Sequence, residues 1–273
     1  MRFSCLAHLL VLLSTGAVAD GIELQRPSAF SNLVSADTVE RSSAAQYAQV
    51  ISDAAAHGAL APASHPDAVR VRAIAQRMLP FAARVNPRAA SWKWQVNYVG
   101  SKQINAWCMP GGKIVVYSGL LKGLALSDDE LAVVLGHEIS HALREHARAR
   151  MGKSAAVGLG SALLGQVVGH GKYSGAFELG GNLLNLRFSR NDEVEADEVG
   201  LDLAARAGFN PRAGLSLWRK MAAASRGAPP EWLSTHPASS SRIADIERIL
   251  PKVEPVYETA LAQMSRGRAH ASR

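Results

Sequence analysis

Two histidines and a glutamate with helical spacing form the stretch of this sequence best suited to hold a metal ion, His137-Glu138-Ile139-Ser140-His141. Residues four apart on a helix lie on one face, so His137 and His141 can offer two imidazole nitrogens to the same ion. Glu138, next to them, is a carboxylate that can take a proton from the attacking water. This H-E-x-x-H arrangement predicts two zinc ligands and a general base, with a chance match on an amphipathic helix as the alternative.

The flanking residues predict a single helix over about 127–150 that carries the motif. Ser127 followed by Glu130 forms a capping-box pattern at its start. Arginines suit the negative end of the helix dipole, and three gather at the far end: Arg144, Arg148 and Arg150. Apolar residues recur at three- and four-residue steps: Leu131, Leu135, Ile139 and Ala142 or Leu143. This stripe should bury the helix and leave the histidine face toward a cleft.

Composition and the first residues place the chain outside the cytoplasm. With 273 residues and 48% hydrophobic content, it can bury a sizeable core and is not a disordered protein. An apolar run after Arg2, followed by Ala17-Val18-Ala19, predicts a signal peptide over 1–19 that is cleaved after Ala19. Cys108 is then the one cysteine left, so we expect a small buried residue and no internal disulfide.

The charge pattern argues against a nucleic-acid partner. The net charge is +7, but the basic residues are scattered along the expected helices and at the carboxyl end. The predicted export also separates the protein from the nucleic acids of the cytoplasm. We therefore expect that the protein binds no nucleic acid. We expect it to lie in the cell envelope, where it can contact anionic lipid at the membrane surface.

Helices followed by a hairpin predict an α+β, mainly helical fold. Helices are expected over 35–57 and 66–85, and strict alternation over 92–98 predicts a strand. Two β-prone runs, 104–109 and 113–117, flank the turn Pro110-Gly111-Gly112 and predict a hairpin beside the metal helix. A strand at the rim of a cleft can hold an extended peptide by backbone pairing. A hairpin that only completes the sheet is the alternative.

An uncharged, glycine-rich tract covers 154–171. Its length approaches a membrane span, but its Gly, Ser and Gln content makes a weak one. We favour a mobile helical lid over the cleft, with a membrane-contacting segment as the alternative.

A catalytic zinc site needs a third protein ligand besides the two histidines. A third histidine six residues after His141 is excluded, because Ala147 stands there and His146 is off register. The best acidic cluster spans 190–198. A solvated acidic helix face is its alternative reading.

Several motifs together resemble the zinc metallopeptidase family of HtpX and the CAAX prenyl protease, in particular its soluble periplasmic members. They follow one another in the order Asn105-Ala106 with Pro110-Gly111-Gly112, His137-Glu138-x-x-His141, Ser189-Arg190-x-x-Glu193-x-Glu195-Ala196-Asp197-x-x-Gly200, Thr235-His236-Pro237 and Arg242-Ile243. The resemblance covers about residues 66–250. It implies a zincin-like metallopeptidase domain with a small β-sheet or hairpin beside the H-E-x-x-H helix.

The resemblance implies Glu193 as the third zinc ligand. Asp197, four residues on, shares its helix face and can accept the N–H of a ligand histidine. Glu195 should point elsewhere, so its removal should leave the metal nearly unaffected. Substrate contacts are expected at the hairpin motif, from Asn105, Gly111 and Gly112.

His236 and Arg242 complete the implied site. In the family, the histidine of Thr-His-Pro lies at the cleft, where it either hydrogen-bonds the developing oxyanion or occupies the open metal position in a closed state. Arg242 is expected to organise that loop. Without the resemblance, His236 would be read as an ordinary loop histidine before a proline.

These predictions divide the chain into a signal peptide (1–19), an N-terminal helical segment (20–65), a metallopeptidase domain (66–250) and a basic C-terminal tail (251–273). The function expected is a periplasmic endopeptidase with one Zn²⁺ per chain, which hydrolyses misfolded or unassembled envelope proteins and is associated with the outer membrane. The rival is a chaperone-like zinc protein that assists the outer-membrane assembly machinery with little cleavage.

Overall fold

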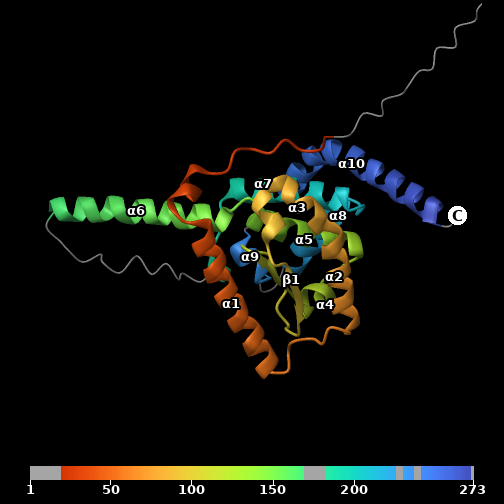
Figure 1. The fold of residues 1–273 in the computed structure, drawn as a ribbon, viewed down its shortest axis with the longest axis horizontal. Helices are drawn as coiled ribbons and strands as arrows, with labels where there is room; N and C mark the ends of the chain where they lie inside the picture. Colours follow the sequence, from red (N-terminus) through yellow and green to blue (C-terminus); the bar gives the residue numbers. More distant parts are fainter. Residues whose placement is uncertain (1–19, 169–182, 226–229, 237–240, 272–273) are drawn as a thin grey trace, which may run out of the picture.

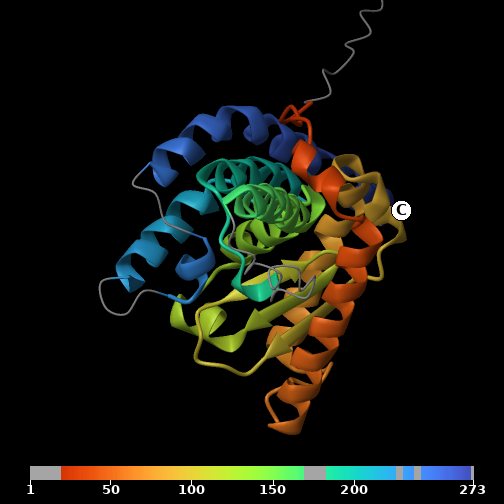
Figure 2. The same cartoon turned by 90° about the vertical axis from the view of Figure 1, so that its left-hand side faces the viewer.

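The computed structural model describes residues 20–168, 183–225, 230–236 and 241–271, and the predicted signal peptide lies outside them. Helices dominate, with a small sheet beside the helix that carries the histidines, which confirms the predicted fold class (Figure 1). Helices α7 (Arg190–Arg206) and α10 (Arg242–Ala271) lie on one side of the molecule and the sheet on the other (Figure 2). The central helix α5 (Asp128–Leu143) packs between them, against α7 and against strand β2 (Ala106–Met109).

The N-terminal part is helical. After the 3-10 turn η1 (Ala29–Leu33), α1 (Ala36–Ala56) matches the helix expected over 35–57. The helix expected over 66–85 is divided into α2 (Pro66–Met78), η2 (Leu79–Phe81) and α3 (Ala82–Val85). Pro80 explains the division, since proline has no N–H for the carbonyl four residues earlier and its ring clashes with that carbonyl.

The sheet contains the predicted hairpin. Strands β2 (Ala106–Met109) and β3 (Lys113–Tyr117) pair antiparallel around the Pro110-Gly111-Gly112 turn. β1 (Gln95–Val99) follows the 3-10 turn η3 (Pro87–Ser91) and pairs parallel to β3, so the order among the described strands is β1-β3-β2. The strand expected over 92–98 therefore begins three residues later. β2 lies at the edge of this sheet.

Helix α5 (Asp128–Leu143) follows α4 (Ser118–Gly123) and begins with the predicted capping box. The Ser127 hydroxyl accepts from the Glu130 amide at 3.2 Å, and the Glu130 carboxylate accepts from the Ser127 amide at 2.8 Å. Two of the unpaired amides at the helix start are thereby satisfied.

Replacing Ser127 by Ala should lower the free energy of unfolding by about 1 kcal/mol, because one of these amides loses its acceptor. Chemical denaturation of the whole chain measures the change. Ser64→Ala, at an exposed serine in a turn, is the control. Equal effects of the two substitutions would contradict a capping role for Ser127.

The prediction of one helix over 127–150 is wrong. α5 ends at Leu143, Glu145 adopts a positive φ of 57°, and α6 (His146–Val168) begins in a new direction. Arg144 explains the break, because its guanidinium is buried against Glu195 of α7 and the backbone carbonyl of Gln25. These tertiary contacts outweigh local helix propensity.

Helix α6 contains most of the uncharged tract 154–171, of which 169–171 lie outside the described residues. It packs against η1 near its start and then runs away from the rest of the fold (Figure 1). The described part of the tract is helical, as expected, but it does not lie over the sheet or α5. Within the described residues, no helix is long and apolar enough to cross a membrane.

The later helices complete the core. They are η4 (Leu183–Asn185), α7 (Arg190–Arg206), α8 (Ala213–Ala224), α9 (Trp232–Thr235) and α10 (Arg242–Ala271). α10 continues through the residues predicted as a tail, and its Val253 and Val256 are buried in the main core.

Helices α5 and α7 touch at a pair of glycines. A Cβ at Gly200 would lie 2.7 Å from the backbone nitrogen of His137, and one at Gly136 would lie 2.4 Å from the Gly200 carbonyl oxygen. Real Cβ atoms do not approach backbone so closely, so both positions need glycine. This close crossing brings the acidic face of α7 within reach of the histidines.

Candidate metal centre

Four buried side chains from three helical segments converge on one point. His137 and His141 come from α5, Glu193 from α7, and His236 from the end of α9. One potential ligand atom of each lies within 4.8 Å of the others. Each residue exposes less than 5% of its surface, with values of 2%, 4%, 2% and 3%. Pro237, the last residue of the Thr-His-Pro motif, lies outside the described residues.

The spacing of the donor atoms fits a small tetrahedral ion. The Nε2 atoms of His137 and His141 are 3.1 Å apart, and each is 3.5 Å from a Glu193 carboxylate oxygen. Ligand bonds of about 2.0–2.1 Å around zinc place neighbouring ligand atoms about 3.3 Å apart. Two imidazoles and a carboxylate at these distances can therefore hold such an ion.

His236 stands at the fourth corner of this arrangement. Its Nδ1 lies 3.2 Å from the Nε2 of His137 and 3.1 Å from Oε1 of Glu193. Its Nε2 lies 3.5 Å from Oε1 of Glu138. The imidazole therefore lies where a fourth ligand of such an ion would stand.

Asp197 and Arg242 contact the side chains of this candidate site and hold them in place. Asp197 Oδ1 accepts from Nδ1 of His137 at 2.9 Å. The Arg242 guanidinium donates to both carboxylates, at 2.8 Å to Glu193 Oε2 and 2.8 Å to Asp197 Oδ1, and it also lies over the Trp218 ring. Arg242 was expected to organise the loop of His236, and the structure places it on the acidic pair of α7.

The electrostatics of the cluster keep its carboxylates ionised. Burial raises the pKa of Glu193, but contacts with His137 and His236 outweigh it and hold that pKa well below its usual range. Burial likewise raises the pKa of Asp197, and Arg242 and His137 lower it further than burial raises it. Burial lowers the pKa of His137, but the carboxylates of Asp197 and Glu193 together raise it to about 9. The negative charges of Glu193 and Asp197 therefore favour binding of a cation at this site.

Glu138 is held by a residue that the sequence reasoning missed. The indole Nε1 of Trp232 donates to Glu138 Oε1 at 2.5 Å. Trp232 is buried and packs between the rings of Trp218 and His236. Its position four residues before His236, on the same helical turn, was the available signal.

His146 and Glu195 were also missed. His146 was considered only as a ligand, and Glu195 was expected to point elsewhere. Glu195 does lie outside the four-residue cluster. However, His146 contacts the Nδ1 of His141, and Glu195 contacts His146.

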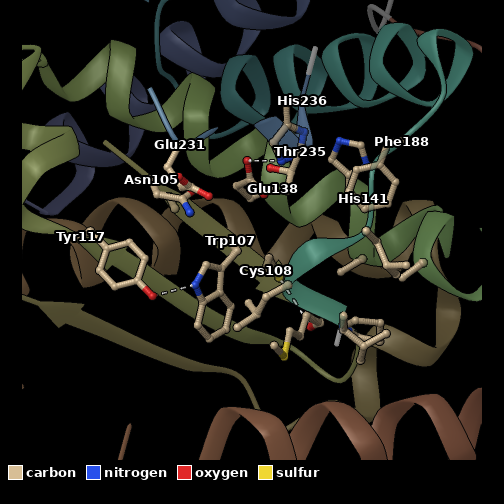
Figure 3. Close-up of a pocket in the computed structure, with 18 of the residues that line it drawn as sticks. Asn105, Trp107, Cys108, Tyr117, Glu138, His141, Phe188, Glu231, Thr235 and His236 are labelled. Carbon is tan, nitrogen blue, oxygen red and sulfur yellow. Dashed lines mark hydrogen bonds and ion pairs between the residues drawn. The ribbon is translucent and has the colours of Figure 1, made fainter. Parts of the chain in front are cut away.

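A cavity of about 250 Å³ opens beside Glu138 and His141. Figure 3 shows Glu138 and His236 along one side and Trp107 with Tyr117 on another. Other lining residues are mostly apolar and include Met109, Leu184, Leu186 and Phe188. Of the residues expected to contact substrate, Asn105 lines the cavity.

The two glycines of the hairpin turn lie away from this cavity. Gly111 and Gly112 have φ of 81° and 78°, which favours glycine. A Cβ at Gly112 would lie 2.7 Å from the Trp94 ring, and one at Gly111 would contact Glu40 of α1. Cys108 lines the cavity and is buried, as expected, and burial raises the pKa of its thiol.

Comparison with known proteins matches the part of the chain that carries these motifs. Residues 65–250 match peptidase family M48. The chain is 32% identical over 231 residues to the mitochondrial metalloendopeptidase OMA1 of Schizosaccharomyces pombe, a match covering 84% of this chain and 66% of the relative. It is 31% identical over 190 residues to the metalloprotease LoiP of Escherichia coli, covering 68% and 72%.

The beta-barrel assembly-enhancing protease of Yersinia pestis is 36% identical over 179 residues, covering 60% of this chain and 36% of that protein. The matches to OMA1 cover 66% of the Schizosaccharomyces pombe protein, 60% of the Saccharomyces cerevisiae protein and 39% of the Bos taurus protein. The family match covers more than half of this chain and nearly coincides with the range 66–250 of the predicted resemblance. The chain therefore belongs to peptidase family M48.

Proposed function

We propose that this protein is a zinc-dependent endopeptidase whose metal is held by His137, His141 and Glu193. The observation that carries the proposal is the near-tetrahedral set of buried donor atoms with Glu138 beside it. Two histidines and one carboxylate, with a fourth position for water, form a known catalytic zinc ligand set. Membership of a peptidase family supports this chemistry.

Glu138 acts as the general base. Bound zinc would lower the pKa of the attacking water and polarise the scissile carbonyl. Glu138 accepts the proton of that water and passes it to the leaving amine. The indole of Trp232 fixes the carboxylate's orientation through its 2.5 Å hydrogen bond.

The substrates are extended segments of unfolded polypeptides. β2 lies at the edge of the described sheet, and Trp107, Cys108 and Met109 of this strand line the cavity. An extended peptide can add to such an edge by backbone hydrogen bonds, which need no particular sequence. The predicted signal peptide supports a location in the periplasm, where the substrates would be misfolded or unassembled envelope proteins. The name of one relative, beta-barrel assembly-enhancing protease, supports contact with the outer-membrane assembly machinery.

Digestion of casein by the purified chain tests the proposed activity. Hydrolysis should stop when a chelator removes the metal and return when zinc is added in stoichiometric amount. Casein that stays intact under all three conditions would contradict the proposal.

The chaperone-like function is favoured by one observation, the His236 imidazole at the fourth corner, which would block a bound metal from substrate. The name of one relative, beta-barrel assembly-enhancing protease, joins proteolysis with assembly and supports considering this alternative. Suppression of casein aggregation without cleavage would favour the chaperone.

His236→Ala should raise basal casein hydrolysis, because His236 fills the open metal position. A closed arrangement favoured by about 1.4 kcal/mol would give about a tenfold rise. Steady-state rates at equal zinc content measure it, with His57→Ala, at an exposed histidine, as the control. A loss of about 10²–10³-fold in kcat with zinc retained would instead identify His236 as an oxyanion donor.

A further inference from the structure

Each ligand histidine of α5 is connected to a different carboxylate of α7. His137 contacts Asp197 directly. On the other side, the Nδ1 of His141 lies 2.9 Å from the Nδ1 of His146, and the Nε2 of His146 lies 2.9 Å from Oε2 of Glu195. His141 therefore reaches a carboxylate through one intervening imidazole.

The break between α5 and α6 makes this contact possible. In an uninterrupted helix, a residue five positions after His141 would point about 140° away from it. The chain instead turns at Glu145, with φ of 57°, and His146 at the start of α6 faces back toward His141. The imidazole of His146 is buried, with 4% of its surface exposed.

One arrangement of protons satisfies both contacts in the series from His141 through His146 to Glu195. The Nε2 of His141 faces the ligand cluster, so this nitrogen must keep its lone pair free for a metal. The ring proton then sits on Nδ1 and is donated to Nδ1 of His146. His146 carries its own proton on Nε2 and donates it to the carboxylate of Glu195.

Arg144 holds Glu195, the last residue of this hydrogen-bonded series, in place. Its Nε and Nη2 lie 2.7 and 2.6 Å from Oε1 of Glu195, and Nη2 also donates to the Gln25 carbonyl. Burial raises the pKa of Glu195, but His146 and Arg144 lower it more, so the carboxylate is ionised near neutral pH. Phe188 stacks on the His141 ring, with centroids 4.0 Å apart, and limits its rotation.

We propose that His146 and Glu195, steadied by Arg144, are positioning residues that orient His141 for metal binding. They are the counterpart of Asp197 and Arg242, which act on His137. The proposal rests on the metal-binding function proposed for the same site. It replaces the sequence-based expectation that removing Glu195 leaves the metal nearly unaffected.

Zinc affinity of the chelator-stripped chain, measured by competition with a chromophoric chelator, tests the proposal. His146→Ala and Glu195→Ala should each weaken zinc binding by about 10–100-fold, as loss of a partner behind a ligand does. Glu198→Ala is the matched control, because Glu198 lies on the same helix and faces Lys252 of α10. Its zinc affinity should equal that of the parent.

Added imidazole separates positioning from a structural role. Imidazole should restore part of the zinc affinity of His146→Ala, while the Tm of the metal-free variant stays close to that of the metal-free parent. His146→Gln takes its place if His146→Ala fails to fold. The positioning role would be overturned if the His146 and Glu195 variants bound zinc as tightly as the parent and Glu198→Ala. It would also be overturned if their loss of zinc affinity came with a lower metal-free Tm and was not restored by imidazole. A parent chain that binds no zinc would instead overturn the proposed function.

Discussion

Replacing Glu138 by Gln should leave zinc bound and reduce peptide hydrolysis by about 10²–10⁴-fold, the range that a general base contributes. The three proposed ligands are unchanged, and the amide oxygen of glutamine can still accept the indole N–H of Trp232. An amide cannot take up the proton of the attacking water at neutral pH, so the chemical step is lost. Metal analysis and casein hydrolysis of the same preparation measure both results.

The matched control for this variant is Glu231→Gln, at a cavity-lining glutamate that lies outside the four-residue cluster. It should retain zinc and most of the activity. Hydrolysis by Glu138→Gln at a rate close to that of the parent would remove Glu138 from the role of general base. Loss of zinc from Glu138→Gln would point to a role in metal binding instead.

Replacing Glu193 by Ala should lower zinc affinity by more than about 100-fold, beyond the range expected for an indirect partner. The substitution removes the one carboxylate that lies 3.5 Å from both ligand imidazoles. It also leaves the buried Arg242 guanidinium with one carboxylate in place of two. Hydrolysis should fall with zinc occupancy and recover only at high zinc concentration.

Asp197→Asn provides the comparison for Glu193→Ala. Asparagine keeps the shape of the residue behind His137 but loses its charge, so zinc affinity should fall by about 10–100-fold. A larger loss for Asp197→Asn than for Glu193→Ala would show that the two carboxylates have been assigned in the wrong order.

Local sequence patterns were sufficient for the elements that carry the site. The Ser127 capping box and the apolar stripe depend on residues within a few turns, so they predicted the start and buried face of α5 correctly. The Pro-Gly-Gly turn predicted the β2–β3 hairpin for the same reason. The motif spacing also identified the family, because several short patterns recur in one order.

The end of α5 could not be predicted in this way. Helix propensity continues past Leu143, and the arginines that follow suit a helix end. Arg144 instead contacts Glu195 and the Gln25 carbonyl, residues distant in sequence that only the folded chain brings near. Tertiary contacts therefore decided where the helix stops.

The sequence by itself determined the chemistry available to this protein, because H-E-x-x-H on a helix places two imidazoles and a carboxylate on neighbouring positions. Apart from the family resemblance, which implies Glu193, it left open which acidic residue of α7 lies beside the histidines and where His236 lies. The tertiary structure decided both placements through the glycine contact between α5 and α7 and the position of α9, which set distances between groups 43 to 105 residues apart. Such distances depend on how whole helices pack, and no local pattern encodes them.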